Sequence, residues 1–160
     1  MVSVYLICVG KLKEKFYLDA CQEYLKRLKG YCKLTLVEIP EAKLPQSPSL
    51  GEIAAALDKE GDAIRAKLPP GGTLVALCVE GKQLSSEELA GWIEKQGVGG
   101  CGDLAFVIGS SHGLAPAVKQ AAALRFSMGR ITLPHQLARL VLCEQIYRAF
   151  SINAGSKYHK

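Results

Sequence analysis

A glycine- and serine-rich loop follows an apolar run in the second half of the chain and could hold a ligand. Residues 104–108 read Leu-Ala-Phe-Val-Ile, and Gly-Ser-Ser-His-Gly follows at 109–113. This pattern is typical of a buried parallel strand, and open α/β sheets bind ligands beyond the carboxyl ends of such strands. Glycines at 109 and 113 would let the backbone turn with positive φ and approach a ligand. A plain turn is the alternative, but similar patterns at 73–82 and 126–136 favour a ligand site.

The composition is typical of one globular domain with a modest positive charge. Of the 160 residues, 49% are hydrophobic and 22% are charged, so we expect a single domain over residues 1–160. The formal net charge of +5 mildly favours a polyanionic partner such as a nucleic acid.

Several common classes of site are not indicated. The six cysteines have no C-x-x-C spacing, so we expect no metal site, and Cys8, Cys78 and Cys143 lie in apolar runs as small core residues. The sequence has no G-x-G-x-x-G after the first strand and no P-loop, which argues against dinucleotide or nucleotide hydrolysis sites. Cysteines of this kind fit a reducing cytoplasm, which is where we expect the protein. No apolar run is long enough to cross a membrane, so we expect no membrane partner.

Alternating strand and helix patterns must position these loops. Ser49 with Glu52 and Ser85 with Glu88 have the spacing of capping boxes, and Glu80-Gly81-Lys82 is expected to end the third strand as a turn. The alternation predicts an α/β fold with a mostly parallel sheet. The expected strands are 2–9, 34–39, 73–79, 104–108 and 124–127, and the expected helices are 14–29, 49–67, 85–96, 115–123 and 134–150.

The last expected helix is apolar around most of its circumference. A helix of this kind must be buried on more than one side. In a chain this small a subunit interface would bury the second side, so we expect a homodimer. The tail at 151–160 has no pattern typical of a core element.

The chain resembles a known family from end to end. The matching segments are 9–14 (VGKLKE), 80–82 (EGK) with 84–86 (LSS), 106–113 (FVIGSSHG), 133–139 (LPHQLAR), 144–150 (EQIYRAF) and 158–160 (YHK). They resemble the small bacterial SPOUT methyltransferases that methylate N3 of a pseudouridine in 23S ribosomal RNA. The C-terminal half carries the most specific part of the resemblance.

This resemblance implies a C-terminal trefoil knot and S-adenosylmethionine as the cofactor. Knots are so rare that pattern reasoning would not predict one. Without the resemblance, Leu77 and Ile131 would be interpreted as ordinary core residues. Carried over by position, the cofactor pocket consists of Leu77, Gly109, Met128, Gly129, Arg130, Ile131, Thr132 and Leu133.

Methylation at N3 also requires that a proton leave the base. The candidates for this chemistry are His159, Glu144 and Arg148, and the resemblance implies that Tyr158 and His159 close over the cofactor, from the same subunit or from its partner. Glu144 and Arg148 are four residues apart, so a purely structural ion pair is the alternative. Arg148 could otherwise hold a phosphate or the target base.

The RNA-binding surface should be basic. Lys11, Lys13 and Lys15 follow the first strand, and His135 at the start of the last helix is a further candidate contact, whereas His112 is the weakest histidine candidate. The resemblance implies that the partner is 23S RNA in the assembled ribosome. Two alternatives stay open: a SPOUT methyltransferase with another RNA target such as a tRNA, and a non-catalytic RNA-binding module.

Overall fold

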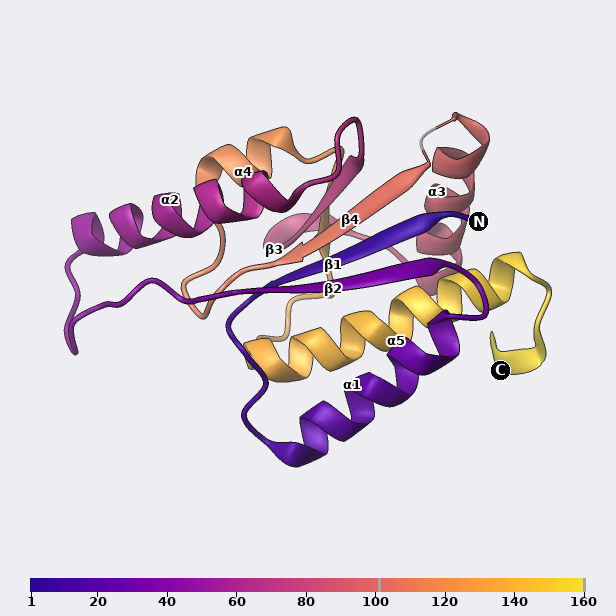
Figure 1. The fold of residues 1–160 in the computed structure, drawn as a ribbon, viewed down its shortest axis with the longest axis horizontal. Helices are drawn as coiled ribbons and strands as arrows, with labels where there is room; N and C mark the ends of the chain where they lie inside the picture. Colours follow the sequence, from indigo (N-terminus) through magenta and orange to yellow (C-terminus); the bar gives the residue numbers. More distant parts are fainter. Residues whose placement is uncertain (101, 160) are drawn as a thin grey trace.

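A five-stranded sheet lies between two layers of helices (Figure 1). The computed structural model describes residues 1–100 and 102–159, apart from the side chains at positions 98 and 159. The elements in chain order are β1 Ser3–Val9, α1 Lys15–Leu28, β2 Lys33–Ile39, α2 Leu50–Lys67, β3 Thr73–Gln83, α3 Ser86–Val98, β4 Asp103–Ile108, α4 Pro116–Ala121, β5 Leu124–Ser127, α5 His135–Asn153 and the 3-10 helix η1 Lys157–His159.

The strands lie in the order β2-β1-β4-β3-β5, and every neighbouring pair is parallel. Leu6 of β1 lies opposite Leu36 of β2 and Phe106 of β4. Strands β1 and β4 lie inside the sheet. Their side chains are apolar in continuous runs because helices cover both faces of the sheet. The predicted α/β class with a mostly parallel sheet is confirmed.

The two faces of the sheet have separate cores. On one face, Ile7 and Val107 pack with Ile64 of α2 and Val118 of α4. On the other face, α1, α3 and α5 bury the larger cluster, which includes Leu6, Phe106, Leu28, Leu89, Leu142 and Ile146. Cys8, Cys78 and Cys143 are buried as predicted, and burial raises the pKa of the Cys8 thiol to about 12.

Local signals placed the helices well, but one turn prediction is wrong. Ser49 Oγ accepts a hydrogen bond from Glu52 N at 3.1 Å, and Ser85 caps α3 in the same way. Residues 80–82 do not end β3, because the strand bulges between Leu77 and Lys82, which both lie opposite Phe126. A Cβ on Gly81 would lie 2.7 Å from the carbonyl carbon of Arg125, so glycine permits this close approach.

Helix α5 is covered within the chain on more than one side. It packs under the sheet with α1 along one flank and α3 along the other (Figure 1). Leu142, Cys143, Ile146 and Ala149 are consequently buried without a second subunit. Packing within one chain therefore accounts for the apolar residues around the helix. The homodimer stays a prediction.

Candidate active site

The candidate site is a pocket of about 720 Å³ at the carboxyl ends of β3, β4 and β5. The bulge of β3, the loop after β4 and the connection between β5 and α5 line it. These are the three stretches that share the pattern of an apolar run followed by a glycine and polar loop. A parallel sheet brings them together because the carboxyl ends of its strands lie at one edge.

Seven of the eight residues assigned to the cofactor pocket line this cavity: Leu77, Gly109, Met128, Gly129, Ile131, Thr132 and Leu133. Arg130 is exposed and is not among the lining residues. Ile131 is 83% exposed although it is apolar, and it lies at the open side of the pocket. A ligand in the pocket would cover apolar surface that the protein itself leaves to solvent.

The loop after β4 needs glycine at both ends, for two different reasons. Gly113 has φ +91°, and its N–H donates to the carbonyl of Ser110 at 2.9 Å. Gly109 does not have positive φ, contrary to the prediction. A Cβ there would lie 2.6 Å from the carbonyl carbon of Gly113, so the two ends of the loop meet only because residue 109 has no side chain.

The connection from β5 to α5 begins with a tight turn. Ser127 Oγ accepts from the N–H of Gly129 and donates to its carbonyl, both at 3.2 Å, and Gly129 has φ +121°. This geometry directs the chain across the pocket towards His135 and Ala138 of α5, which also line it. His135, predicted as an RNA contact, therefore borders the pocket.

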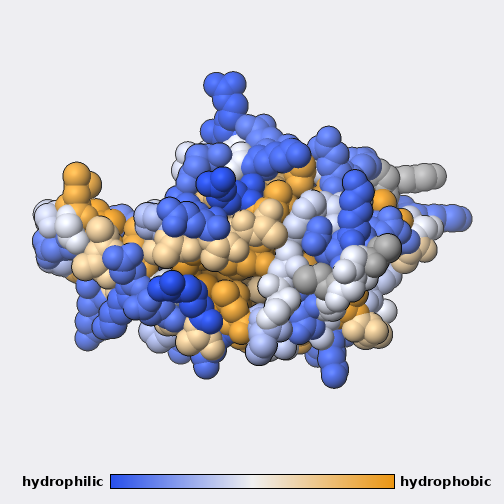
Figure 2. Space-filling model, turned by 90° about the horizontal axis from the view of Figure 1, so that it is seen from above, coloured by the Kyte–Doolittle hydropathy of each residue, from blue (hydrophilic) through white to orange (hydrophobic). Residues whose placement is uncertain are grey.

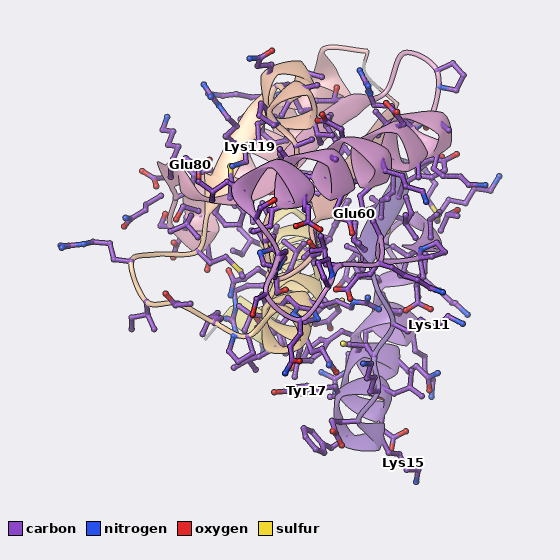
Figure 3. The ribbon with its side chains drawn as sticks, turned by 90° about the vertical axis from the view of Figure 1, so that its left-hand side faces the viewer. Lys11, Lys15, Tyr17, Glu60, Glu80 and Lys119 are labelled. Atoms are coloured by element: carbon purple, nitrogen blue, oxygen red, sulfur yellow. The ribbon has the colours of Figure 1, made fainter. Side chains whose placement is uncertain are left out.

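An ion pair that sequence reasoning missed lies at the mouth of the pocket. Lys119 Nζ donates to Glu80 Oε1 at 2.5 Å, and both residues line the cavity (Figure 3). The hydrogen bond from Lys119 lowers the pKa of the Glu80 carboxyl. Glu80 directly follows the strand that the sequence predicts at 73–79, which is a signal that could have been used, but nothing local to Lys119 indicates its partner 39 residues away.

The predicted catalytic residues form a second cluster further along α5. Arg148 Nε donates to Glu144 Oε1 at 2.9 Å, and the Tyr158 hydroxyl lies 3.4 Å from the same oxygen. Gln145 Nε2 donates to Glu144 Oε2 at 2.7 Å. The Arg148 guanidinium lies 5.1 Å from the centre of the Tyr158 ring. The tail therefore folds back onto the helix instead of extending away from it.

Electrostatics in this tail cluster keep both Tyr158 and Arg148 protonated. Burial, followed by a hydrogen bond with Tyr24, raises the pKa of Tyr158 to about 12. The hydrogen bond to Glu144 raises the pKa of Arg148 above its already high ordinary value. The predicted Glu144–Arg148 contact is present, but an ion pair alone does not distinguish a catalytic role from a structural one.

The cluster does not border the pocket of its own chain. Glu144, Arg148 and Tyr158 are absent from the residues that line the cavity. Glu144 and Arg148 lie six and ten residues beyond Ala138 on α5, which is roughly 9 to 15 Å along the helix axis. The chain end lies beside the far end of α5 (Figure 1). His159 belongs to η1, but its side chain lies outside the described part of the chain.

The predicted basic contacts lie near the start of α5. Lys11, Lys13 and Lys15 are exposed, and the N–H of Lys13 donates to Gln136 Oε1 at 3.3 Å. Buried Arg139 holds this region together, because it donates to Glu38 Oε2 at 2.8 Å and to the Gly10 carbonyl at 2.9 Å. The end view in Figure 3 shows Lys11 and Lys15 on the same end of the molecule as the Glu80–Lys119 pair.

The described residues form neither a metal-binding cluster nor a membrane-spanning helix. Residues 1–100 and 102–159 contain no group of three or more His, Cys, Asp or Glu side chains placed to hold a metal ion. Within the same ranges, no helix combines the length and the hydropathy that a membrane crossing requires.

Comparison with known proteins decides the family. A family model described as predicted SPOUT methyltransferase matches residues 2–159. The chain belongs to the SPOUT methyltransferase family. It is 48% identical, over 99% of its length and 100% of theirs, to proteins named ribosomal RNA large subunit methyltransferase H from Ligilactobacillus salivarius and Listeria monocytogenes. The relative of that name from Leuconostoc mesenteroides is 46% identical over the same shares.

Solved structures agree on the fold of this SPOUT protein. A probable methyltransferase from Bordetella pertussis has a TM-score of 0.57 at 18% identity, covering 92% of this chain and 95% of that one. A probable methylase family protein from Haemophilus influenzae has a TM-score of 0.55 at 13% identity, covering 98% and 70%. At these identities the likeness concerns the fold alone.

Proposed function

We propose that this chain is an enzyme that transfers a methyl group from S-adenosylmethionine to N3 of a pseudouridine in 23S ribosomal RNA. The observation that carries the proposal is 48% identity, over the whole length of both chains, to proteins named ribosomal RNA large subunit methyltransferase H. We further propose that it acts in the cytoplasm, on the assembled ribosome, because a single domain of 160 residues offers little surface for choosing one base in free RNA.

The pocket suits the proposed cofactor. Its volume of about 720 Å³ lies within the range of pockets for drug-sized ligands. S-adenosylmethionine would supply an activated methyl group on a sulfonium centre. Residues 109–113, 127–129 and 131–133 would offer it backbone N–H and carbonyl groups, while Leu77, Ile131 and Leu133 would pack against its apolar parts. By family membership we also propose that this region forms the trefoil knot.

We propose a homodimer in which the tail of one protomer serves the pocket of the other. Two observations support this arrangement: the tail cluster is remote from its own pocket, and α1 exposes Phe16 and Leu18, at 64% and 41%. Tyr158 and His159 would then come within reach of the base, with His159 accepting the N3 proton. Glu144 is the weaker candidate for that base because Arg148, Gln145 and Tyr158 already surround its carboxylate.

Lys11, Lys13, Lys15 and His135 are proposed to contact the RNA. Lys11 and Lys15 are exposed at the pocket end of the molecule (Figure 3), and the exposed Lys13 lies beside Gln136 at the start of α5, so phosphate contacts there would orient the substrate. Replacing the three lysines with methionine should raise KM for ribosomes and flatten its salt dependence, while kcat changes little.

The decisive experiment uses ribosomes that lack this modification. Purified protein and S-adenosylmethionine are incubated with 70S ribosomes, free 23S RNA and bulk tRNA, and the methylated base is identified by mass spectrometry. We expect one N3-methylated pseudouridine, formed faster on ribosomes than on free RNA. Methylation of tRNA alone would contradict the proposed target. Calorimetry without any heat of S-adenosylmethionine binding would instead indicate a non-catalytic RNA-binding module.

A further inference from the structure

A second cavity, of about 810 Å³, lies between α2 and the connection that leads to it from β2. Its walls are mostly small apolar side chains, among them Pro40, Ala42, Leu44 and Ala56. Figure 2 looks onto the face with α2 and α4, where apolar surface extends between hydrophilic side chains. None of the residues assigned to methyl transfer lines this second cavity.

One carboxylate in this cavity lacks half of its hydrogen bonds. Glu60 lines the cavity from α2 and is only 5% exposed. Its Oε2 accepts from the N–H of Ala42 at 2.9 Å, whereas Oε1 is buried and has no hydrogen-bond partner among the described residues. Burying a carboxylate oxygen without a partner is costly, so the site is suited to a ligand that brings N–H donors.

The cavity adjoins the proposed RNA surface. The N–H of Gly10 donates to the Ile39 carbonyl at 2.7 Å, so the connections that follow β1 and β2 start side by side. Lys11 follows Gly10 directly, and Ile39 is part of the cavity wall. Figure 3 shows Glu60 beneath α2 at the same end of the molecule as Lys11. The exposed Lys43 and Lys59 also line the cavity, as do the exposed Glu41 and Glu52, so its rim carries both charges.

We propose that this second cavity binds an unpaired guanine of the RNA substrate. Guanine presents two neighbouring N–H donors that one carboxylate can accept, whereas uracil presents a single N–H between two carbonyl oxygens that a carboxylate repels. The apolar walls would contact the faces of the base, and Lys11, Lys43 and Lys59 would meet the adjoining phosphates. The identity of the ligand as RNA rests on the proposed function.

Nuclear magnetic resonance of the full chain can test this site without any methyl transfer. Guanosine 5′-monophosphate and uridine 5′-monophosphate are titrated separately while the amide signals of Ala42 and residues 55–60 are followed. We expect saturable shifts with guanosine monophosphate at roughly tenfold or greater preference over uridine monophosphate, the discrimination of a bidentate pair. Equal binding of the two, or shifts confined to other regions, would overturn the proposal.

Glu60→Gln is the matched variant, because its amide oxygen still accepts from Ala42 while an N–H₂ replaces the second acceptor. It should weaken guanosine monophosphate binding by roughly tenfold or more and raise KM for ribosomes without changing kcat. Asp62→Asn makes the same chemical change at an exposed carboxylate of α2 and should alter neither. Should Glu60→Gln fail to fold, Ala55→Phe fills the cavity from an exposed position and should block binding.

Two further results separate this inference from its alternatives and from the proposed function. If arginine amide shifts the cavity signals and guanosine monophosphate does not, the cavity accepts a basic side chain of a protein and the inference is wrong. Methylation of ribosomes by the wild-type chain tests the proposed function independently. If Glu60→Gln binds guanosine monophosphate as tightly as the wild-type chain, the guanine site is contradicted, even when the wild-type chain methylates ribosomes normally.

Discussion

The two ends of α5 carry two parts of the predicted site that are built in different ways. At its start, the bulge of β3, the loop after β4 and the β5–α5 connection form a pocket, with Gly109 and Gly113 closing the loop after β4. Towards its end, side chains of one helix and the tail form a cluster around the Glu144 carboxylate. The pocket depends on where strands end, and the cluster depends on where the tail folds.

This difference explains why the pocket forms where it does, whereas the tail cluster lies away from it in the same chain. Carboxyl ends of parallel strands share an edge of the sheet, so their loops meet regardless of how far apart they are in sequence. The tail has no such constraint, and in a single chain it rests against Tyr147, with 4.6 Å between the ring centres of Tyr147 and Tyr158. Four predictions test this contrast.

Gly109→Val should have the largest effect and act on the pocket alone. The new side chain overlaps the backbone of Gly113, so the loop must open. We expect loss of measurable S-adenosylmethionine binding by calorimetry and a decrease of about 1–3 kcal/mol in the free energy of unfolding. Gly91→Ala is the control, because a Cβ there meets nothing within 4 Å. Wild-type affinity in Gly109→Val would show that the loop does not shape the pocket.

Removal of residues 158–160 should act on the cluster alone. We expect methyl transfer to ribosomes to fall by roughly a hundredfold because the reacting groups lose their alignment. Affinity for S-adenosylmethionine should change little, and the lost Tyr147–Tyr158 contact should cost about 1 kcal/mol of stability. His159→Ala should reproduce the loss of activity and remove one limb of the pH–rate profile if His159 accepts the proton. An unaltered profile would assign His159 to positioning.

Mixing the Gly109→Val protein with the protein that lacks residues 158–160 should recover methyl transfer if the tail acts across a dimer. The truncated protomer keeps its pocket and the Gly109→Val protomer keeps its tail, so each heterodimer would contain one complete site. Random exchange in a twofold dimer predicts recovery of about a quarter of wild-type activity. Sedimentation checks that dimers form in the mixture. No recovery despite exchanged dimers would place the tail and the pocket of one protomer in the same site.

The smallest effect is expected at the mouth of the pocket. Lys119 lowers the pKa of Glu80, so their pairing stabilises the fold above the ordinary glutamate pKa and is lost as pH falls through the lowered value. Lys119→Met should reduce stability at pH 7 by less than about 0.5 kcal/mol, because Glu80 is well exposed. Near pH 3, urea unfolding should give the same free energy of unfolding for Lys119→Met and for the unchanged protein. Lys95→Met, at an exposed position of α3, is the control. If Lys119→Met lowers the free energy of unfolding equally at pH 7 and near pH 3, the loss comes from packing and not from the ion pair.

Much of the fold and part of the site followed from local patterns. Capping boxes at Ser49 and Ser85 determined where two helices begin, and apolar runs determined the central strands. The glycine loop at 109–113 was placed correctly as a pocket element, although for the wrong conformational reason at Gly109. These features depend on residues within a few positions of one another, which is the range over which a sequence pattern carries information.

The tertiary structure alone decided the long-range contacts. Arg139 joins Glu38 and Gly10 because β1 and β2 are neighbours above the start of α5, and Glu38 is 101 residues away in sequence. The bulge of β3 places Glu80 beside Lys119, and the β2–α2 connection leaves Glu60 Oε1 without a hydrogen-bond partner among the residues that the structure describes. The sequence by itself determined the elements and the residues that could do chemistry. Strand order and the paths of the connections decided which of them meet, because those distances depend on how the layers pack and not on spacing along the chain.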